Sequence, residues 1–214
     1  MKNKCILVGN IVEKIRPCMN QETGEQLTLA GEKMYETKLD VTRLSGVKDE
    51  ICLVIPEDKL PEFSEKRVRV TGRFCSRNET VDGHRRLILY VYVTRITEAD
   101  VEQEDINILY LNGYMCKDPV YRETPKRRKI TDLLLANNQT FSKGDRAAYY
   151  IPAICWGRNA EESSKFSKRD FVRITGRIQS RIYAKGENKY TVYEVSVSKI
   201  HERKAPMKRQ ENNN

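Results

Sequence analysis

Residues 68–78 read VRVTGRFCSRN, and residues 172–182 read VRITGRIQSRI, a closely similar pattern 104 positions further along the chain. The same offset of 104 relates Gly9 in ILVGN to Gly113 in LYLNG. It also relates the ends of the segments LILYVYVTRI and YTVYEVSVSKI. Three separated matches in one register indicate that the chain contains two copies of one structural unit.

The register slips between these matches. TKLDV at Thr37 corresponds best to TDLLL at Thr131, an offset of 94 residues. The first copy therefore contains about ten more residues before this segment (104 minus 94), and the second copy recovers them later. Length differences of this kind occur in surface loops between strands.

Apolar runs in the second copy predict five strands, at residues 108–114, 130–136, 149–156, 172–183 and 190–200. GRNAEESSKFSKRD, between the third and fourth runs, has a helical composition, and KGENK and ETVDGH predict hairpin tips. In the first copy we expect the helix in PEDKLPEFSEKR, where Pro61 makes it short or irregular. This pattern is typical of the OB-fold. We therefore predict an all-β chain of two tandem OB-fold five-stranded barrels, each with one short helix between strands 3 and 4.

The two barrels differ in charge. Residues 1–104 carry 17 Lys and Arg against 18 Asp and Glu, whereas residues 105–214 carry 22 against 12, which together give the net charge of +9. The excess on the second half predicts an anionic partner, nucleic acid before a membrane surface. We expect an N-terminal barrel in residues 1–100, a C-terminal barrel in residues 105–202, and a disordered basic and polar tail in residues 203–214.

Several function classes are disfavoured by the composition. The chain has no run of about 18 or more apolar residues, which argues against a transmembrane helix. Its six cysteines are scattered without metal-ligand spacing, as is typical of reduced, structural thiols in an intracellular protein. Neither His84 nor His201 has neighbours suited to metal or triad chemistry, and no P-loop motif occurs. We therefore expect no catalytic residues, metal or cofactor, and no enzymatic activity.

The second copy contains, in order, LNGYMCKDPVYRETP, LLLANNQTF, YYIPAICWGRNAEESSKF, ITGRIQSRIY and YTVYEVSV. With these segments, across residues 108–200, it closely resembles the bacterial single-stranded DNA-binding protein family. The two-copy layout, with GEKMYETKLDVTRLSG in the first copy, resembles a group of such proteins in clostridia-like bacteria. The resemblance implies sequence-tolerant binding and protection of single-stranded DNA in replication, recombination or repair, by a cytoplasmic, nucleoid-associated protein.

In that family bases stack on four aromatic side chains, because every base offers a flat π-face. Carried over segment by segment, these positions fall on Phe141, Tyr150, Trp156 and Tyr183. Tyr149 is the alternative to Tyr150, since it faces the opposite side of the same strand. The corresponding positions of the first copy are Val47, Asp49, Ile55 and Glu79, none of them aromatic. The second copy is therefore expected to bind DNA, and the first to be degenerate in DNA-contact residues.

Basic side chains gather near these aromatics in the second copy, and we expect them to contact phosphates. They are Lys126, Arg127 and Arg128 between the first two strands, Lys143 and Arg146 beside Phe141, Arg158 beside Trp156, Arg177 and Arg181 on the fourth strand, and Lys185 and Lys189 at the hairpin tip. Arg177, Gln179 and Arg181 share one strand face by alternation. For the run at residues 126–129 a solvated surface is the alternative.

Other readings stay open. The chain can be a plasmid, phage or primosome accessory protein, or a single-stranded RNA binder, because stacking alone does not distinguish the two sugars. It can also be an assembly protein whose first barrel dimerises. By analogy with the four-barrel assembly usual in the family, we expect a homodimer and no membrane partner. The tail HERKAPMKRQENNN lacks the acidic tip with which family members recruit replication and repair enzymes, so such partners are not implied.

Overall fold

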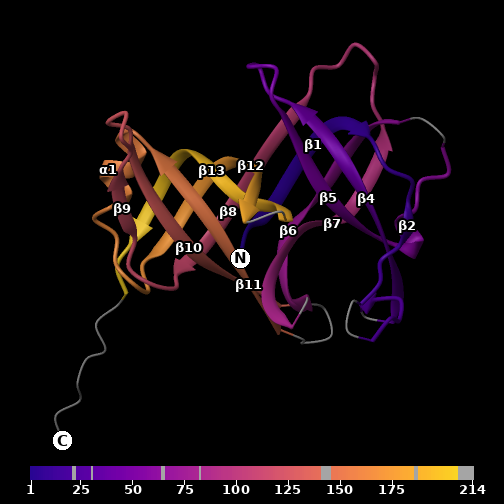
Figure 1. Cartoon of the computed structure of the whole chain (residues 1–214), viewed down its shortest axis with the longest axis horizontal. Helices are drawn as coiled ribbons and strands as arrows, with labels where there is room; N and C mark the ends of the chain where they lie inside the picture. Colours follow the sequence, from indigo (N-terminus) through magenta and orange to yellow (C-terminus); the bar gives the residue numbers. More distant parts are fainter. Residues whose placement is uncertain are drawn as a thin grey trace, which may run out of the picture.

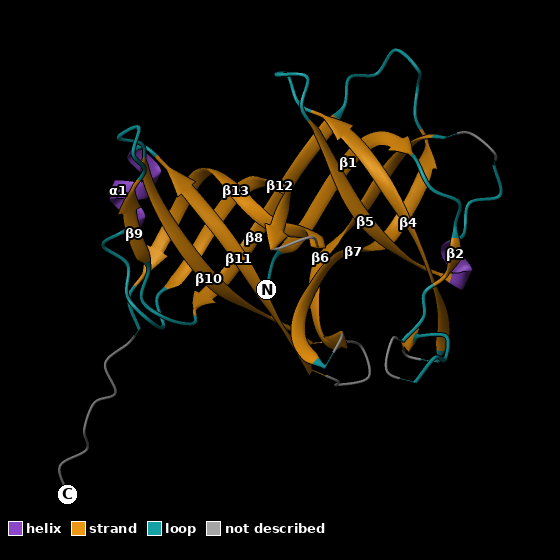
Figure 2. Ribbon diagram, viewed as in Figure 1, coloured by secondary structure: helices purple, strands orange, loops and turns teal. Residues whose placement is uncertain are grey.

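The computed structural model describes residues 1–20, 23–29, 31–63, 66–81, 83–140, 146–185 and 188–206, and strands make up most of this part of the chain (Figures 1 and 2). The strands form two sets that lie side by side, the first in indigo and magenta and the second in orange and yellow in Figure 1. No helix in the described ranges is long and apolar enough to cross a membrane.

The first unit, residues 3–98, contains β1 (Asn3–Ile11), β2 (Arg16–Pro17), β3 (Thr28–Leu29), β4 (Glu32–Thr42), β5 (Lys48–Pro56), the 3₁₀ turn η1 (Glu57–Lys59), β6 (Arg67–Val81) and β7 (His84–Glu98). The second unit, residues 106–204, contains β8 (Ile106–Met115), β9 (Val120–Glu123), β10 (Lys129–Thr140), β11 (Arg146–Trp156), α1 (Arg158–Ser163), β12 (Phe171–Lys185) and β13 (Asn188–Lys204).

Strand pairing closes each unit into a ring of five long strands. In the first unit β1 pairs with β4, β4 with β5, β5 with β7, β7 with β6, and β6 with β1. In the second unit β8, β10, β11, β13 and β12 close in the same order. Alternate side chains point into each ring, so that Ile51, Leu53 and Ile55 of β5 are all fully buried.

The expected elements are present, with several differences. Three short strands, β2, β3 and β9, were not predicted from the sequence. β2 and β3 pair with β4, and β9 pairs with the start of β10. The helix expected in the first unit is reduced to η1, since Pro61 lacks the N–H group that would continue the turn. β13 runs further than expected, so Arg203 and Lys204 pair with β12 instead of belonging to the tail. The remainder of that tail, from residue 207, lies outside the described residues.

Sheet register corrects the offset between β4 and β10. Ile11 pairs with Leu39 in the first unit, and Met115 pairs with Leu135 in the second. The two strands are therefore related by 96 residues (Leu39 to Leu135) instead of 94. Because the error is an even number of residues, it leaves every side chain of β10 on its expected face.

The two units are joined by antiparallel pairing of β1 with β8. Cys5 faces Leu109 in the middle of this pairing, and these two residues occupy equivalent positions of the two units, 104 residues apart. The pairing is therefore symmetric about one point, like an isologous interface between two copies of one protein. A single apolar cluster of buried side chains draws from both units, so they share one core.

Two asparagines at equivalent positions fix the ends of this pairing. Asn3 donates through Nδ2 to the carbonyl of Phe74 at 2.8 Å and accepts from the Phe74 N–H at 2.9 Å. Asn107 does the same with Ile178, at 2.7 and 2.9 Å. Asn3 also donates to Asn137 of the second unit at 3.2 Å. Each asparagine thus satisfies a pair of backbone groups that would otherwise be buried without partners.

The glycine of the repeated TGR motif is required by a close approach of two strands. A Cβ atom on Gly72 would lie 2.5 Å from the carbonyl oxygen of Tyr92, and one on Gly176 would lie 2.4 Å from that of Ser196. The strand register also shifts at both glycines. Each glycine therefore marks a bulge at which the long hairpin strand bends.

All six cysteines are free, as the sequence predicts. Burial raises the pKa of Cys5, Cys52 and Cys75 to about 12 and that of Cys155 to about 11. These thiols therefore stay protonated at neutral pH and pack as small apolar side chains.

We predict that Asn3→Ala lowers the free energy of unfolding by about 1–3 kcal/mol, because it leaves the buried Phe74 N–H and C=O groups without partners. Chemical denaturation monitored by circular dichroism measures the change. Asn10→Ala, on the exposed side of the same strand, is the matched control. Equal destabilisation by the two substitutions would contradict the role given to Asn3.

Candidate nucleic-acid interface

The outer face of β11 presents two aromatic side chains. Tyr150 and Trp156 lie an even number of residues apart, and the pairing of β10 with β11 is regular along its whole length, so both point away from the ring. Tyr150 is 44% exposed and Trp156 is 39% exposed. The alternate residues between them point into the ring of strands, and they are buried: Ile151, Ala153 and Cys155.

The structure distinguishes Tyr150 from its neighbour Tyr149. Tyr149 is half-buried and packs against the shared core and the smaller apolar cluster around Cys75 and Tyr90 of the first unit. Burial, followed by the neighbouring Cys75, raises the pKa of the Tyr149 hydroxyl. Tyr150 is therefore the tyrosine that is open to a ligand.

Trp156 is held at a corner of the second unit. Gly157 follows it with φ of 55°, a conformation that favours glycine, and its N–H donates to the carbonyl of Lys129 at 3.0 Å. The helix α1 starts directly afterwards and is fixed to β10 because the Thr131 hydroxyl donates to the carbonyl of Ala160 at 2.7 Å. Arg158, the first residue of α1, is exposed beside the indole in sequence.

The loop between β9 and β10 carries three exposed cations, Lys126, Arg127 and Arg128. The loop is closed by the Thr124 N–H donating to the Arg128 carbonyl at 2.9 Å, and Arg127 adopts a positive φ of 55° at the turn. Lys129, the fourth basic residue of the run, forms an ion pair with Glu161 of α1. The run therefore divides into three solvent-facing cations and one with a structural contact.

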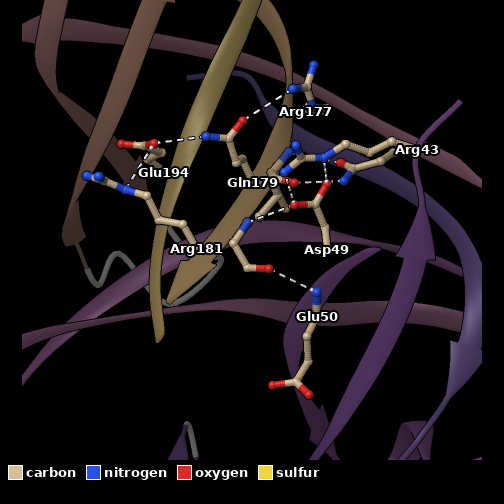
Figure 3. A network of polar contacts seen from close by, with 10 residues as sticks. Arg43, Asp49, Glu50, Arg177, Gln179, Arg181 and Glu194 are labelled. Carbon is tan, nitrogen blue, oxygen red and sulfur yellow. Dashed lines mark hydrogen bonds and ion pairs between the residues drawn. The ribbon is translucent and has the colours of Figure 1, made fainter. Parts of the chain in front are cut away.

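Arg177, Gln179 and Arg181 alternate on the outer face of β12, as expected, and form a polar chain with Glu194 of β13 (Figure 3). Arg177 donates to Gln179 Oε1 at 3.2 Å, and Gln179 Nε2 donates to Glu194 Oε1 at 3.0 Å. Arg181 Nε lies 3.4 Å from the same oxygen, with 59% of its side chain exposed. Arg181 is thus open to solvent at the edge of this chain.

Arg177 is partly enclosed by the first unit. It lines a cavity of about 450 Å³ with Arg43 and Asp49, and burial followed by the charge of Arg43 lowers its pKa. Asp49 is fully buried, binds Arg43 at 2.7 and 2.5 Å, and accepts the N–H of Ser180 at 2.9 Å (Figure 3). Arg177 is therefore less available to a ligand than Arg181.

Five of the expected contact residues cannot be placed in full. Phe141 and Lys143 lie outside the described residues. The backbone of Tyr183, Lys185 and Lys189 belongs to the β12–β13 hairpin, in which Tyr183 pairs with Tyr190, but their side chains are not described. Arg146 is exposed at the start of β11.

The strand register corrects two positions assigned to the first unit. Leu53 of β5 pairs with Val91, and Ala153 of β11 pairs with Val195. The two strands are therefore related by 100 residues (Leu53 to Ala153), one fewer than the sequence comparison implies. A shift of one residue in a strand exchanges its faces, so the expected counterparts Asp49 and Ile55 are buried inside.

The true counterparts of Tyr150 and Trp156 are Glu50 and Pro56. The same backbone contact supports the first equivalence in both units. The Tyr150 N–H donates to Ser76 Oγ at 2.8 Å, and the Glu50 N–H donates to Ser180 Oγ at 3.0 Å. Ser76 and Ser180 are themselves 104 residues apart. The first unit thus lacks aromatics at both positions, as expected, although two of the residues assigned to them were wrong.

Two charged residues of this face were missed from the sequence. Arg122 of β9 pairs with Ile130 of β10, and Ile130 pairs on its other side with Trp156 of β11. The Arg122 guanidinium binds Asp132 at 3.0 Å. Glu194 lies between Gln179 and Arg181, and burial is the main cause that raises the pKa of its carboxyl. Arg122 lies four residues before Lys126, the first cation of the basic loop, which is a signal in the sequence, whereas an acidic residue within a basic face gave none.

Comparisons with known proteins agree with this geometry. The family model described as "Single-strand binding protein family" matches residues 106–202, the second unit. The single-stranded DNA-binding protein of Clostridium tetani is 36% identical over 99 residues, which cover 44% of this chain and 68% of that protein. Single-stranded DNA-binding protein 1 of Lactococcus lactis is 38% identical over 81 residues, which cover 36% of this chain and 54% of that one. The matched part of the chain thus spans between about half and two thirds of these relatives.

A solved structure extends the similarity in fold to the first unit. The wild-type single-stranded DNA-binding protein from Thermus aquaticus superposes with a TM-score of 0.72 at 18% identity, covering 97% of this chain and 96% of that one. At this identity the match shows the fold alone. From the second unit, with its exposed aromatics on β11 and its match to the Clostridium tetani protein, the chain belongs to the single-strand binding protein family.

Proposed function

We propose that the second unit binds single-stranded DNA with little sequence preference. The observation that carries this proposal is the pair of exposed aromatics on the outer face of one strand, Tyr150 and Trp156. Six strand residues separate them by roughly 20 Å, so they stack on different bases. Stacking on a side chain accepts any base, and each stacked base contributes about 1–3 kcal/mol. The names of the relatives support the same ligand.

Phosphates are held by cations around these aromatics. The exposed loop at residues 126–128, together with Arg146, Arg158 and Arg181, supplies the charge. We extend the same role to Lys143, Arg177, Lys185 and Lys189, and a stacking role to Phe141 and Tyr183, on the basis of the family resemblance. The excess of ten positive charges in residues 105–214 supports the assignment, since backbone charge dominates affinity for nucleic acids.

The two closed rings are, in this proposal, tandem OB-fold barrels, the first over residues 1–100 and the second from residue 105 to the end of β13 at Lys204, followed by a basic and polar tail. The first barrel has a structural role, because Glu50 and Pro56 stand where the second barrel has Tyr150 and Trp156. In addition, both oxygens of Asp49 already bind Arg43 and the backbone of Ser180. The protein acts by binding and not by catalysis. It protects single strands in the cytoplasm during replication, recombination or repair.

Trp156→Ala and Tyr150→Ala are each expected to weaken binding of oligo(dT) by about 1–3 kcal/mol, because each removes one stacking surface. Fluorescence anisotropy of a labelled oligonucleotide measures the affinity. Trp156 is the single tryptophan of the chain, so its quenching by single-stranded but not duplex DNA gives an independent reading. Glu79→Ala in the first unit is expected to leave affinity unchanged. If Trp156→Ala and Tyr150→Ala also bind oligo(dT) like the wild type, the second unit is not the binding site.

Replacing all three cations at residues 126–128 by alanine should reduce the salt dependence of binding. Each neutralised phosphate contributes about 0.7 to the slope of log affinity against log salt for single strands, so the slope should fall by up to about 2. The matched control removes three exposed lysines of the first unit, Lys14, Lys33 and Lys66. An equal change of slope in both triple variants would mean that net charge alone matters.

We also propose that two chains assemble into a homodimer with four barrels. Two rings already form a symmetric pair within one chain, so two chains supply the four-barrel number of the family. Light scattering coupled to size-exclusion chromatography is expected to give twice the chain mass of 24.9 kDa. A single species at 24.9 kDa across the accessible concentration range would exclude the dimer.

A further inference from the structure

A cavity of about 330 Å³ lies between the two units, at the lower end of the size range of small-molecule pockets. One wall is formed by the first unit, with Leu87, Ile88 and Leu89 of β7. The second unit supplies the other wall and the polar groups, with Pro152 of β11, Arg181 of β12, and Thr191, Val192, Tyr193 and Glu194 of β13. Neither unit makes this pocket alone.

The pocket opens on the face that carries the stacking aromatics. Pro152 is two residues from Tyr150 and four from Trp156, so all three side chains point to the same side of β11. Arg181, one of the proposed phosphate contacts, lies on its border with its guanidinium largely exposed. A strand that stacks on Tyr150 therefore passes the mouth of the pocket.

The walls are suited to a flat, apolar ring. Leu87 is 38% exposed, and it lines the cavity from the first unit. Pro152 and Val192 face the cavity from the second unit. Aliphatic side chains on both sides of a cavity can bury the two faces of any flat ligand ring. They do not distinguish one ring from another, so the choice of ligand must come from the polar groups at the edge of the cavity.

Glu194 is the polar group that selects. Only 11% of its side chain is exposed, and its contacts with Gln179 and Arg181 are both made through Oε1 (Figure 3). Neither of these two contacts uses Oε2, and we assign to this oxygen the hydrogen bond to a ligand. An ionised carboxylate accepts hydrogen bonds and donates none, so it attracts an amino group and repels a carbonyl oxygen.

Glu194 and Pro152 have no counterparts of the same type in the first unit. The residue equivalent to Glu194 in the first unit, 104 positions earlier, is Tyr90, which is 5% exposed and lies under the guanidinium of Arg77 at 5.0 Å. The residue equivalent to Pro152, by the offset of 100 between β5 and β11, is Cys52. The carboxylate is thus a feature of the second unit alone, set against a wall that the first unit supplies.

We propose that this pocket takes one nucleobase of the bound strand, and that Glu194 selects a base with an exocyclic amino group, cytosine before thymine. A carboxylate accepting from the cytosine amino group is an established form of base recognition. The inference rests on the proposed binding of single-stranded DNA and adds to it a site with base preference, to which the first unit contributes one wall.

The test compares oligo(dC) with oligo(dT) of equal length, at a pH above neutrality, for the wild type and Glu194→Gln. The ratio of the two affinities should shift toward thymine by about threefold to tenfold in the variant, the worth of one hydrogen bond. Comparing ratios between proteins cancels the different stacking strengths of the two bases. Glu102→Gln, an exposed carboxylate outside the pocket, removes the same charge and should leave the ratio unchanged.

Leu87→Ala tests the wall that comes from the first unit. It should weaken oligo(dC) binding more than oligo(dT) binding, whereas Leu44→Ala, which shortens a fully exposed leucine elsewhere in the first unit, should change neither. If the ratio of oligo(dC) affinity to oligo(dT) affinity is the same in Glu194→Gln as in the wild type, the proposed base selection by Glu194 is wrong. This holds also if the substitution frees Arg181 and thereby raises both affinities by the same factor. Absence of binding to either oligonucleotide by the wild type would instead overturn the proposed function, so the two failures are distinguishable.

Discussion

Antiparallel pairing between β1 and β8 joins two closed rings of strands into one sheet, and its register determines which side chains of the two units meet. The pairing is centred on Cys5 and Leu109, which are equivalent in the repeat. Asn3 and Asn107, one in each of these strands, bind both backbone groups of a residue on the long hairpin strand of their own unit, and Asn3 also donates to Asn137 of the second unit. A slip by one residue between β1 and β8 would set side chains of opposite faces against each other where the two units meet.

The symmetry of this pairing brings each long hairpin against the other unit. Ser76 of the first hairpin binds the backbone of Tyr150, and Ser180 of the second binds that of Glu50. The same backbone arrangement therefore carries an exposed aromatic in one unit and a carboxylate in the other. Once the fold is held by backbone contacts common to both units, the side chains on the outer faces are free to differ.

Because the outer side chains of the two units are free to differ, the two units can carry different net charges. The second unit concentrates cations around Tyr150 and Trp156, where an anionic strand would offset their mutual repulsion. The first unit is close to neutral, and its Asp49 is buried against Arg43 at the contact with β12. A neutral unit can pack closely beside a basic one without adding to that repulsion. The first unit also closes one side of the pocket beside Glu194, so its position against β11 and β13 sets the shape of this pocket.

Much of the second unit could be predicted from its sequence. Apolar alternation located all five long strands, and a helical segment without glycine or proline located α1. The aromatic residues of the outer face were named from the family resemblance, and the basic residues from their type and from the strand period. In the first unit the same comparison failed by one residue at Glu50 and Pro56, because apolar residues fill most of β5 and leave the alternation without a clear phase.

The repeat, the class of fold and the unequal charge follow from the sequence by itself, because each depends on local patterns or on residue type. The tertiary structure alone decided that Tyr150 and not Tyr149 is open, that Arg177 is enclosed while Arg181 is not, and that Glu194 lies in a pocket walled by Leu87. Each of these depends on which strand of one unit lies against which strand of the other. That arrangement is set by the register of β1 against β8, and no pattern within a single strand encodes it.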